Sequence, residues 1–112
     1  MMNTNPSPIL GPWDHGFTLD VHTVSAEFLG YDLHGHPQFD TVRSEIGEKL
    51  YRLKYRGDRD ASMALAAVAA EFVRDQRIPV DVVVPIPPSK MRSFQPLMDI
   101  ASRLAKRLGV VY

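Results

Sequence analysis

The sequence predicts an α/β fold in which an incomplete parallel sheet with flanking helices follows a small antiparallel β segment. Three patterns support this prediction. Apolar and polar residues alternate from Phe17 to His22, the apolar spacing changes to that of a helix after residue 42, and a nearly continuous apolar run covers residues 80–86. Because a loop, a helix and a second short apolar run follow residue 86, residues 80–112 are typical of a βαβ unit with parallel strands.

Composition limits the size and class of the protein. The 112 residues, 45% hydrophobic and 23% charged, indicate one globular domain. The 13 basic residues balance 13 acidic ones, so any anion site must be local; this argues against strong binding to nucleic acid without excluding it. The absence of cysteine rules out disulfides and thiolate metal sites and favours a cytoplasmic location. No signal-peptide pattern or membrane-length apolar run is present, so we expect no membrane association.

Three segments are expected along the chain. Residues 1–12 contain three prolines and little that could pack, so they predict a flexible arm. Residues 13–41 form a β-rich segment that begins with a strand at Phe17. Within it, SAEFLGYD and HPQFDT flank LHGH, whose Gly35 can adopt positive φ, and together they predict a hairpin. Residues 42–112 form the α/β domain.

Two helices are expected at the start of this domain. The first covers residues 42–56, with Ser44 or Thr41 as its cap and Gly57 just past its end. Its apolar stripe is Val42, Ile46, Leu50 and Leu53. The second helix follows at once, with Asp58 or Asp60 as its cap, and ends before Ile78-Pro79. Its apolar stripe is Leu65, Val68, Ala69, Phe72 and Val73.

The remaining elements form the predicted βαβ unit. The run at 80–86 indicates a strand buried on both faces. After a loop, Pro96 suits the first turn of a helix and Gly109 its end. The residues of that helix expected to be buried are Leu97, Ile100, Ala101, Leu104 and Leu108. Residues 110–112 then open another strand, whose unprotected edge predicts a homo-oligomer.

The loop from Pro87 to Phe94 is the candidate site. In an open parallel sheet, ligands bind at the carboxyl ends of the strands, and this loop occupies that place. Ser89 offers a hydroxyl, Lys90 and Arg92 offer charged donors, and the next helix presents free amides at its start. These groups suit phosphate. The alternative is an ordinary solvated loop whose prolines end the strand.

Two stretches of this region resemble a known family. LKYRGD at 53–58 and DVVVPIPPSKMRSFQPLMDIASRLAKRLGV at 81–110 resemble the ComF-type phosphoribosyltransferase-like family, over roughly residues 44–110. The positions that match the family pattern are Leu53, Lys54, Tyr55, Gly57, Pro85, Pro87, Arg92 and Phe94. The positions that depart from it are Ser93 for glycine, Gln95 for asparagine and Pro96 for glutamine.

The resemblance implies a type I phosphoribosyltransferase-like sheet and a phosphoribosyl pyrophosphate substrate. The implied pyrophosphate-binding residues are Ser89, Lys90, Arg92 and Gln95, with Mg²⁺ completing the charge balance alongside the substrate. Lys54, Tyr55 and Arg56 are possible secondary anion contacts, or helix-end residues that complement the dipole.

The family's acidic phosphoribosyl pyrophosphate loop is absent, because no two acidic residues are adjacent in the sequence. The resemblance therefore implies the N-terminal part of such a domain, or a truncated member, that is inactive alone and carries no cofactor by itself. No catalytic residue is assigned.

Two further hypotheses remain open. The chain could be a noncatalytic interaction module related to DNA-uptake and competence proteins. His34 and His36, with His15 and His22 upstream, have a spacing that a zinc site could use. Because no second half of such a site is visible, we interpret them as turn or surface histidines and assign no metal ligand.

Overall fold

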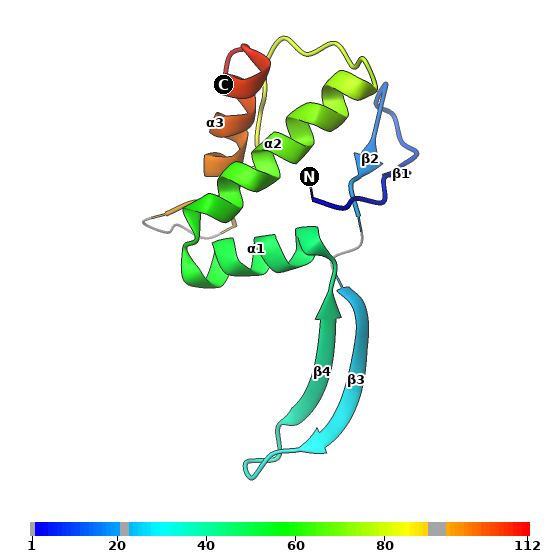
Figure 1. The fold of residues 1–112 in the computed structure, drawn as a ribbon, viewed down its shortest axis with the longest axis vertical. Coiled ribbons are helices and arrows are strands. Elements are labelled where there is room, and N and C mark those ends of the chain that lie inside the picture. The colour runs from blue at the N-terminus through cyan, green and yellow to red at the C-terminus, as the bar shows by residue number, and fades with distance from the viewer. Residues whose placement is uncertain (1, 21–22, 90–93) are drawn as a thin grey trace. The chain divides into compact units, whose positions relative to one another are not determined.

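The computed structural model describes residues 2–20, 23–89 and 94–112. Within these residues the chain is a mixed α/β structure with three helices and two small antiparallel strand pairs (Figure 1). It divides into two compact units, Asn3–Glu48 and a second unit built from Lys49–Tyr112. Every described helix is too short or too polar to cross a bilayer.

The segment expected to be an unstructured arm contains a short strand. β1 (Ser7–Pro8) pairs antiparallel with β2 (Phe17–Thr18), and the amide of Ile9 donates to the carbonyl of Gly16 at 2.7 Å. Pro8 has no amide hydrogen, which fits a short edge pairing better than a longer strand. β2 is shorter than the alternation predicted, and residues 21–22 lie outside the described part of the chain.

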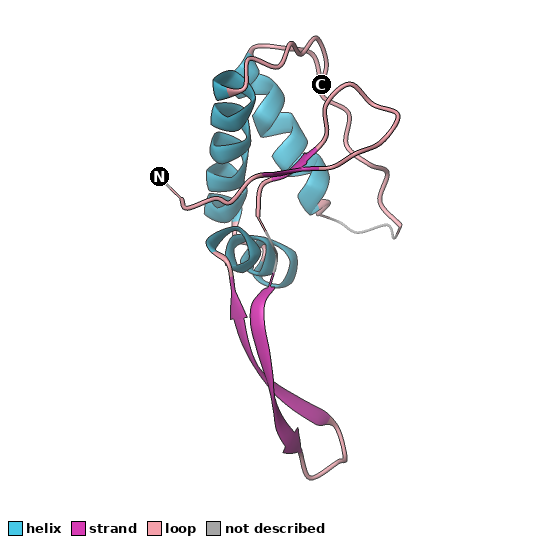
Figure 2. Cartoon of the chain, turned by 90° about the vertical axis from the view of Figure 1, so that its right-hand side faces the viewer, coloured by secondary structure: helices cyan, strands magenta, loops and turns pink. Residues whose placement is uncertain are grey.

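The predicted hairpin is confirmed. β3 (Thr23–Tyr31) pairs antiparallel with β4 (Pro37–Arg43) (Figures 1 and 2). Asp32 organises the turn, because its Oδ1 accepts hydrogen bonds of 2.9 Å from the amides of both His34 and His36. Gly35 adopts a positive φ, as predicted, and its value is 78°.

Helix α1 (Glu45–Arg56) begins three residues later than its apolar pattern indicates. Val42 belongs to β4 and is half exposed, since strand pairing continues to Arg43. Ser44 caps the helix by accepting the Gly47 amide at 3.0 Å. Leu53 is fully buried, and Gly57 follows the helix with φ of 62°.

Helix α2 (Arg59–Asp75) begins at a cap that the sequence predicted. Oδ1 of Asp58 accepts the amides of Asp60 and Ala61 at 3.1 and 3.2 Å. At the other end Arg77 adopts a left-handed φ of 53°, and the amide of Ile78 donates to the carbonyl of Val73 at 3.1 Å. The helix therefore ends before Pro79, as expected. The buried residues of α2 are Ala61, Ser62, Leu65, Ala66, Val68 and Ala70.

Helix α3 (Pro96–Leu108) starts at Pro96 and ends at Gly109, whose φ is 69°, as the sequence predicted. It lies beside α2 in both views (Figures 1 and 2). Its buried residues are Ala101 and Ala105, whereas Leu97, predicted to be buried, is 47% exposed. Both helices bury alanines, whose small side chains let the backbones approach closely, and α2 also buries Leu65 and Val68.

The predicted burial of 80–86 on both faces is wrong. Val84 and Ile86 are exposed, whereas Val83 and Pro85, which alternate with them along the segment, are half buried. One face of the extended segment is covered and the other is open, because a strand buried on both faces needs layers on both sides.

Within the described residues, the parallel pairing in this region consists of one bridge. Val82 pairs parallel with Val111, as the βαβ prediction requires. The amide of Val83 donates to the carbonyl of Val111 at 2.9 Å. An extended parallel sheet of the type I kind is not formed by these residues.

Candidate functional site

The predicted anion loop joins the extended segment to α3. Ser89 is exposed at the end of that segment, and Gln95 occupies the position just before α3, with φ of −108°. Lys90 and Arg92 lie outside the described residues. The structure therefore places the two ends of the predicted site and leaves the arrangement of its cations as a prediction.

The start of α3 presents backbone amides toward the loop. The side chain of Gln95 makes no capping hydrogen bond, although its carbonyl accepts the Asp99 amide at 3.0 Å. The amides of the first helical turn have no intrahelical acceptor, and they carry the positive end of the helix dipole. An anion in the loop could accept hydrogen bonds from them.

Phe94 connects the end of the loop to the start of α2. The guanidinium carbon of Arg59 lies 4.1 Å from the centre of the Phe94 ring, which is a cation–π contact. Such contacts contribute roughly 0.5–1 kcal/mol at exposed sites. This contact links the candidate loop to a helix that packs against α3.

Asp99 forms a charged cluster just inside α3. Its Oδ2 accepts from Nε of Arg103 at 3.0 Å, one helical turn later. Partial burial raises the pKa of Asp99, but the Ser62 hydroxyl, the Arg103 guanidinium and the charge of Arg59 together lower it by more. The pKa of Asp99 therefore lies below its ordinary value, and the carboxylate is ionised at neutral pH.

The buried hydroxyl of Ser62 does not complete this cluster. Among the described residues, no group forms a hydrogen bond of normal geometry with its Oγ. The hydroxyl nevertheless lies close enough to Asp99 to lower the pKa of that carboxyl. We interpret the pair as a long, weak contact, since a buried hydroxyl without a well-formed bond costs stability.

The residues predicted as secondary anion contacts lie in the last turns of α1. Lys54, Tyr55 and Arg56 are all exposed. The ring of Tyr55 lies 5.0 Å from that of Tyr51, and the guanidinium of Arg56 lies 5.8 Å from the Tyr51 ring. These contacts are internal to α1, so the role of the three residues in anion binding stays a prediction.

The histidines lie in different surroundings. The rings of His34 and His36 are 6.3 Å apart at the hairpin turn, where Nδ1 of His36 lies 3.5 Å from Oδ2 of Asp32. His15 lies in the loop between β1 and β2, and His22 is outside the described residues. Across the residues that the structure describes, no group of three or more His, Cys, Asp or Glu is arranged to hold a metal ion.

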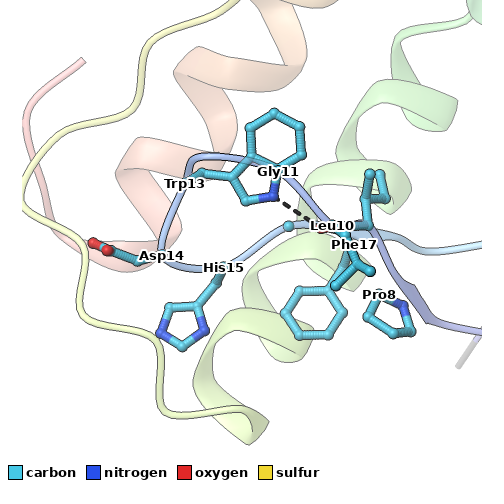
Figure 3. Close-up of a pocket in the computed structure, with 9 residues that line it drawn as sticks. Pro8, Leu10, Gly11, Trp13, Asp14, His15 and Phe17 are labelled. Carbon is cyan, nitrogen blue, oxygen red and sulfur yellow. Dashed lines mark hydrogen bonds between the residues drawn. The ribbon is translucent and has the colours of Figure 1, made fainter.

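A cavity lies in the loop between β1 and β2 (Figure 3). It has a volume of about 240 Å³ and is lined by residues 8–11 and 13–17. The indole of Trp13 donates to the carbonyl of Ile9 at 2.9 Å, and it lies so close to Gly11 and Gly16 that any side chain there would collide with it. The glycines therefore let the indole pack against its own loop. We interpret the cavity as a result of this local packing and assign it no ligand.

Reasoning from the sequence missed four residues around the start of α3: Arg59, Ser62, Asp99 and Arg103. The spacing of Asp99 and Arg103 was a usable signal, because acidic and basic residues four apart on a helix face each other. The contribution of Arg59 and Ser62 had no local signal, since it depends on how α2 packs against α3.

No protein-family model, curated protein or solved structure matches this chain.

Proposed function

We propose that the loop at 87–95 binds the phosphate or pyrophosphate group of a phosphoribosyl substrate, in a chain related to the ComF-type phosphoribosyltransferase-like family. The observation that carries the proposal is the parallel bridge between Val82 and Val111. With this bridge, the loop follows an extended segment and precedes α3, which is the order of elements expected in a βαβ unit. Ligands of open α/β sheets bind at that place.

The chemistry of the loop supports a polyanionic ligand. Ser89 offers a hydroxyl and Gln95 an amide, while Lys90 and Arg92 supply two positive charges from the same short segment. Asp99 would repel an anion at the start of α3, but its ion pair with Arg103 offsets that charge. The prolines at 85, 87 and 88 restrict the loop, which lowers the entropy lost on binding.

The proposal concerns binding and does not extend to catalysis. Mg²⁺ would accompany a pyrophosphate ligand, because its charge offsets that of the phosphates. The family uses an adjacent acidic pair for the ribose hydroxyls, and residues 1–112 contain none.

The proposal is tested by adding inorganic pyrophosphate to the ¹⁵N-labelled protein and following the backbone amide resonances. Saturable shifts are expected at residues 87–97. Lys90→Ala and Arg92→Ala should weaken binding most, whereas Lys49→Ala on α1 removes the same charge and should leave binding unchanged. Silence of the amides at 87–95 would refute the proposal.

A noncatalytic interaction module is the second candidate, and one observation favours it. Val84, Ile86 and Val111 are 79%, 76% and 68% exposed, so the open face of the extended segment is apolar. Such a surface is typical of a contact with another protein. In this hypothesis the face would bind a second copy of the chain, and pyrophosphate would have no effect on residues 87–95.

A further inference from the structure

A cationic groove lies between α2 and α3, and its lining on α3 runs from Arg103 to the last turn of the helix. The groove has a volume of about 280 Å³ and is lined by Met63, Arg103, Lys106 and Arg107. Binding sites for drug-sized molecules have volumes of about 300–1,000 Å³, so this groove suits a small ligand.

Helical spacing explains why three cations share the groove. Lys106 and Arg107 lie three and four residues after Arg103, which places all three on one side of α3. Met63 on α2 forms one side of the groove and the cations on α3 form the other, and both helices bury alanines. Arg74 of α2 donates a hydrogen bond to the carbonyl of Arg107 and so joins the two helices near this end.

The charges in the groove are only partly balanced. Arg103 is held by Asp99 at 3.0 Å. Lys106 and Arg107 are exposed, and neither forms an ion pair with any residue that the structure describes. Cations in the last turn of a helix often complement its dipole, which would account for these two residues by themselves. The helix dipole does not account for the hollow that these two residues line together with Arg103 and Met63.

The groove also has an apolar wall. Met63 is 46% exposed, and it faces the same hollow as the three cations. Methionine is flexible and polarizable, so it can contact apolar groups of varied shape. A ligand that uses the whole groove would combine an anionic group with a short apolar body.

We propose that this groove binds a small phosphate monoester with an apolar body. Lys106 and Arg107 hold the phosphate, Arg103 borders the site while paired with Asp99, and Met63 contacts the apolar part. A dianionic phosphate suits the two cations that have no ion pair among the described residues, Lys106 and Arg107, better than a carboxylate with a single charge does. The site is independent of the proposed function of the loop at 87–95, because none of its lining residues belongs to that loop.

Titration with hexyl phosphate, followed by amide resonances, tests the proposal. Saturable shifts are expected around residues 63 and 103–107. The double variant Lys106→Gln/Arg107→Gln should weaken binding at least about tenfold, since it removes two charge-assisted contacts. Both side chains are exposed, so the variant should fold normally. Lys49→Gln on α1 removes a positive charge outside the groove and should bind hexyl phosphate as the unmodified chain does.

The apolar contact has its own test. Met63→Ala should weaken hexyl phosphate several-fold and leave inorganic phosphate unaffected. Equal effects on both ligands would overturn the assignment of an apolar body. Absence of saturable shifts in the groove would overturn the site, as would unchanged binding in the double variant. If single-stranded DNA shifted the amide resonances of the groove in a strongly salt-dependent way and hexyl phosphate did not, the groove would instead be part of a nucleic-acid-binding surface.

Discussion

The amide of Val83 donates a 2.9 Å hydrogen bond to the carbonyl of Val111, across a parallel bridge between segments almost thirty residues apart. This bond closes the unit that begins with the apolar run and passes through the loop and α3. It also makes the loop at 87–95 the connection between a parallel-paired segment and a helix, and the proposed anion site depends on that position.

Val83→Pro should destabilise the second unit, because proline removes the amide that makes this bond. One net hydrogen bond contributes about 0.5–1.5 kcal/mol to the free energy of unfolding. Urea denaturation measures the loss. Val84→Pro is the matched control, since the exposed Val84 is adjacent and its amide takes no part in the bridge. Equal losses in the two variants would argue that the bridge does not contribute to stability.

Asp58→Ala should lower the free energy of unfolding by about 0.5–2 kcal/mol, because it removes the cap of α2. Oδ1 of Asp58 accepts two amides, whereas Asp60 lies in the first turn and acts mainly on the dipole. Asp60→Ala should therefore cost less in the same denaturation experiment. A larger effect at Asp60 would show that the dipole, rather than the hydrogen bonds, dominates this helix end.

Acid should weaken the contact at the start of α3. The pKa of Asp99 in the folded protein lies below its ordinary value of 3.8, so folding favours the ionised carboxylate. Its contribution to stability is fully present above the ordinary pKa and is lost as the pH falls through the lower, folded pKa. We therefore expect unfolding to become easier below about pH 4.

Asp99→Asn should reduce this dependence on pH, because asparagine does not titrate. Thermal unfolding of both proteins between pH 7 and pH 2.5 provides the measurement. Asp75→Asn, at the exposed end of α2, is the control and should leave the acid dependence unchanged. Identical pH profiles for the unmodified chain and Asp99→Asn would exclude a contribution from the Arg103 pair.

Local chemistry explains the parts of the fold that the sequence predicted well. Ser44 and Asp58 cap helices through side-chain bonds to amides two or three residues away, and Gly57 and Gly109 adopt positive φ where helices end. The hairpin turn is likewise local, because Gly35 and its neighbours determine it. Signals that depend on four or five consecutive residues can be recognised without knowing the rest of the structure.

Distant contacts explain the parts that were not predicted. The apolar run at 80–86 predicts a strand buried on both faces. Burial on both faces requires elements packed on each side, and other parts of the chain would have to supply them. Pairing of Ser7–Pro8 with Phe17–Thr18 is too short to leave a periodic pattern. In the candidate site, Ser89 and Gln95 were predicted from their position just before a helix. The contact of Arg59 with Phe94 was not predicted, because Arg59 belongs to α2, more than thirty residues earlier in the chain.

The open face of the extended segment should promote self-association. Val84 and Ile86 are both more than three-quarters exposed, so burying them in an interface would stabilise a dimer. Sedimentation at micromolar concentration should show a species larger than the monomer, which Val84→Ser/Ile86→Ser reduces. Leu10→Ser/Leu33→Ser removes two other exposed leucines and should not change the assembly. A monomer in every variant would disprove association through this face.

Calorimetric titration with phosphoribosyl pyrophosphate in the presence of Mg²⁺ tests the central claim most directly. We expect saturable binding that Lys90→Ala/Arg92→Ala weakens at least about tenfold, because two charge-assisted contacts are lost. Lys49→Ala, which removes a cation on α1 outside the loop, should bind like the unmodified chain. Absence of binding to the unmodified chain, or equal affinity in the Lys90→Ala/Arg92→Ala variant, would contradict the assignment of the loop at 87–95.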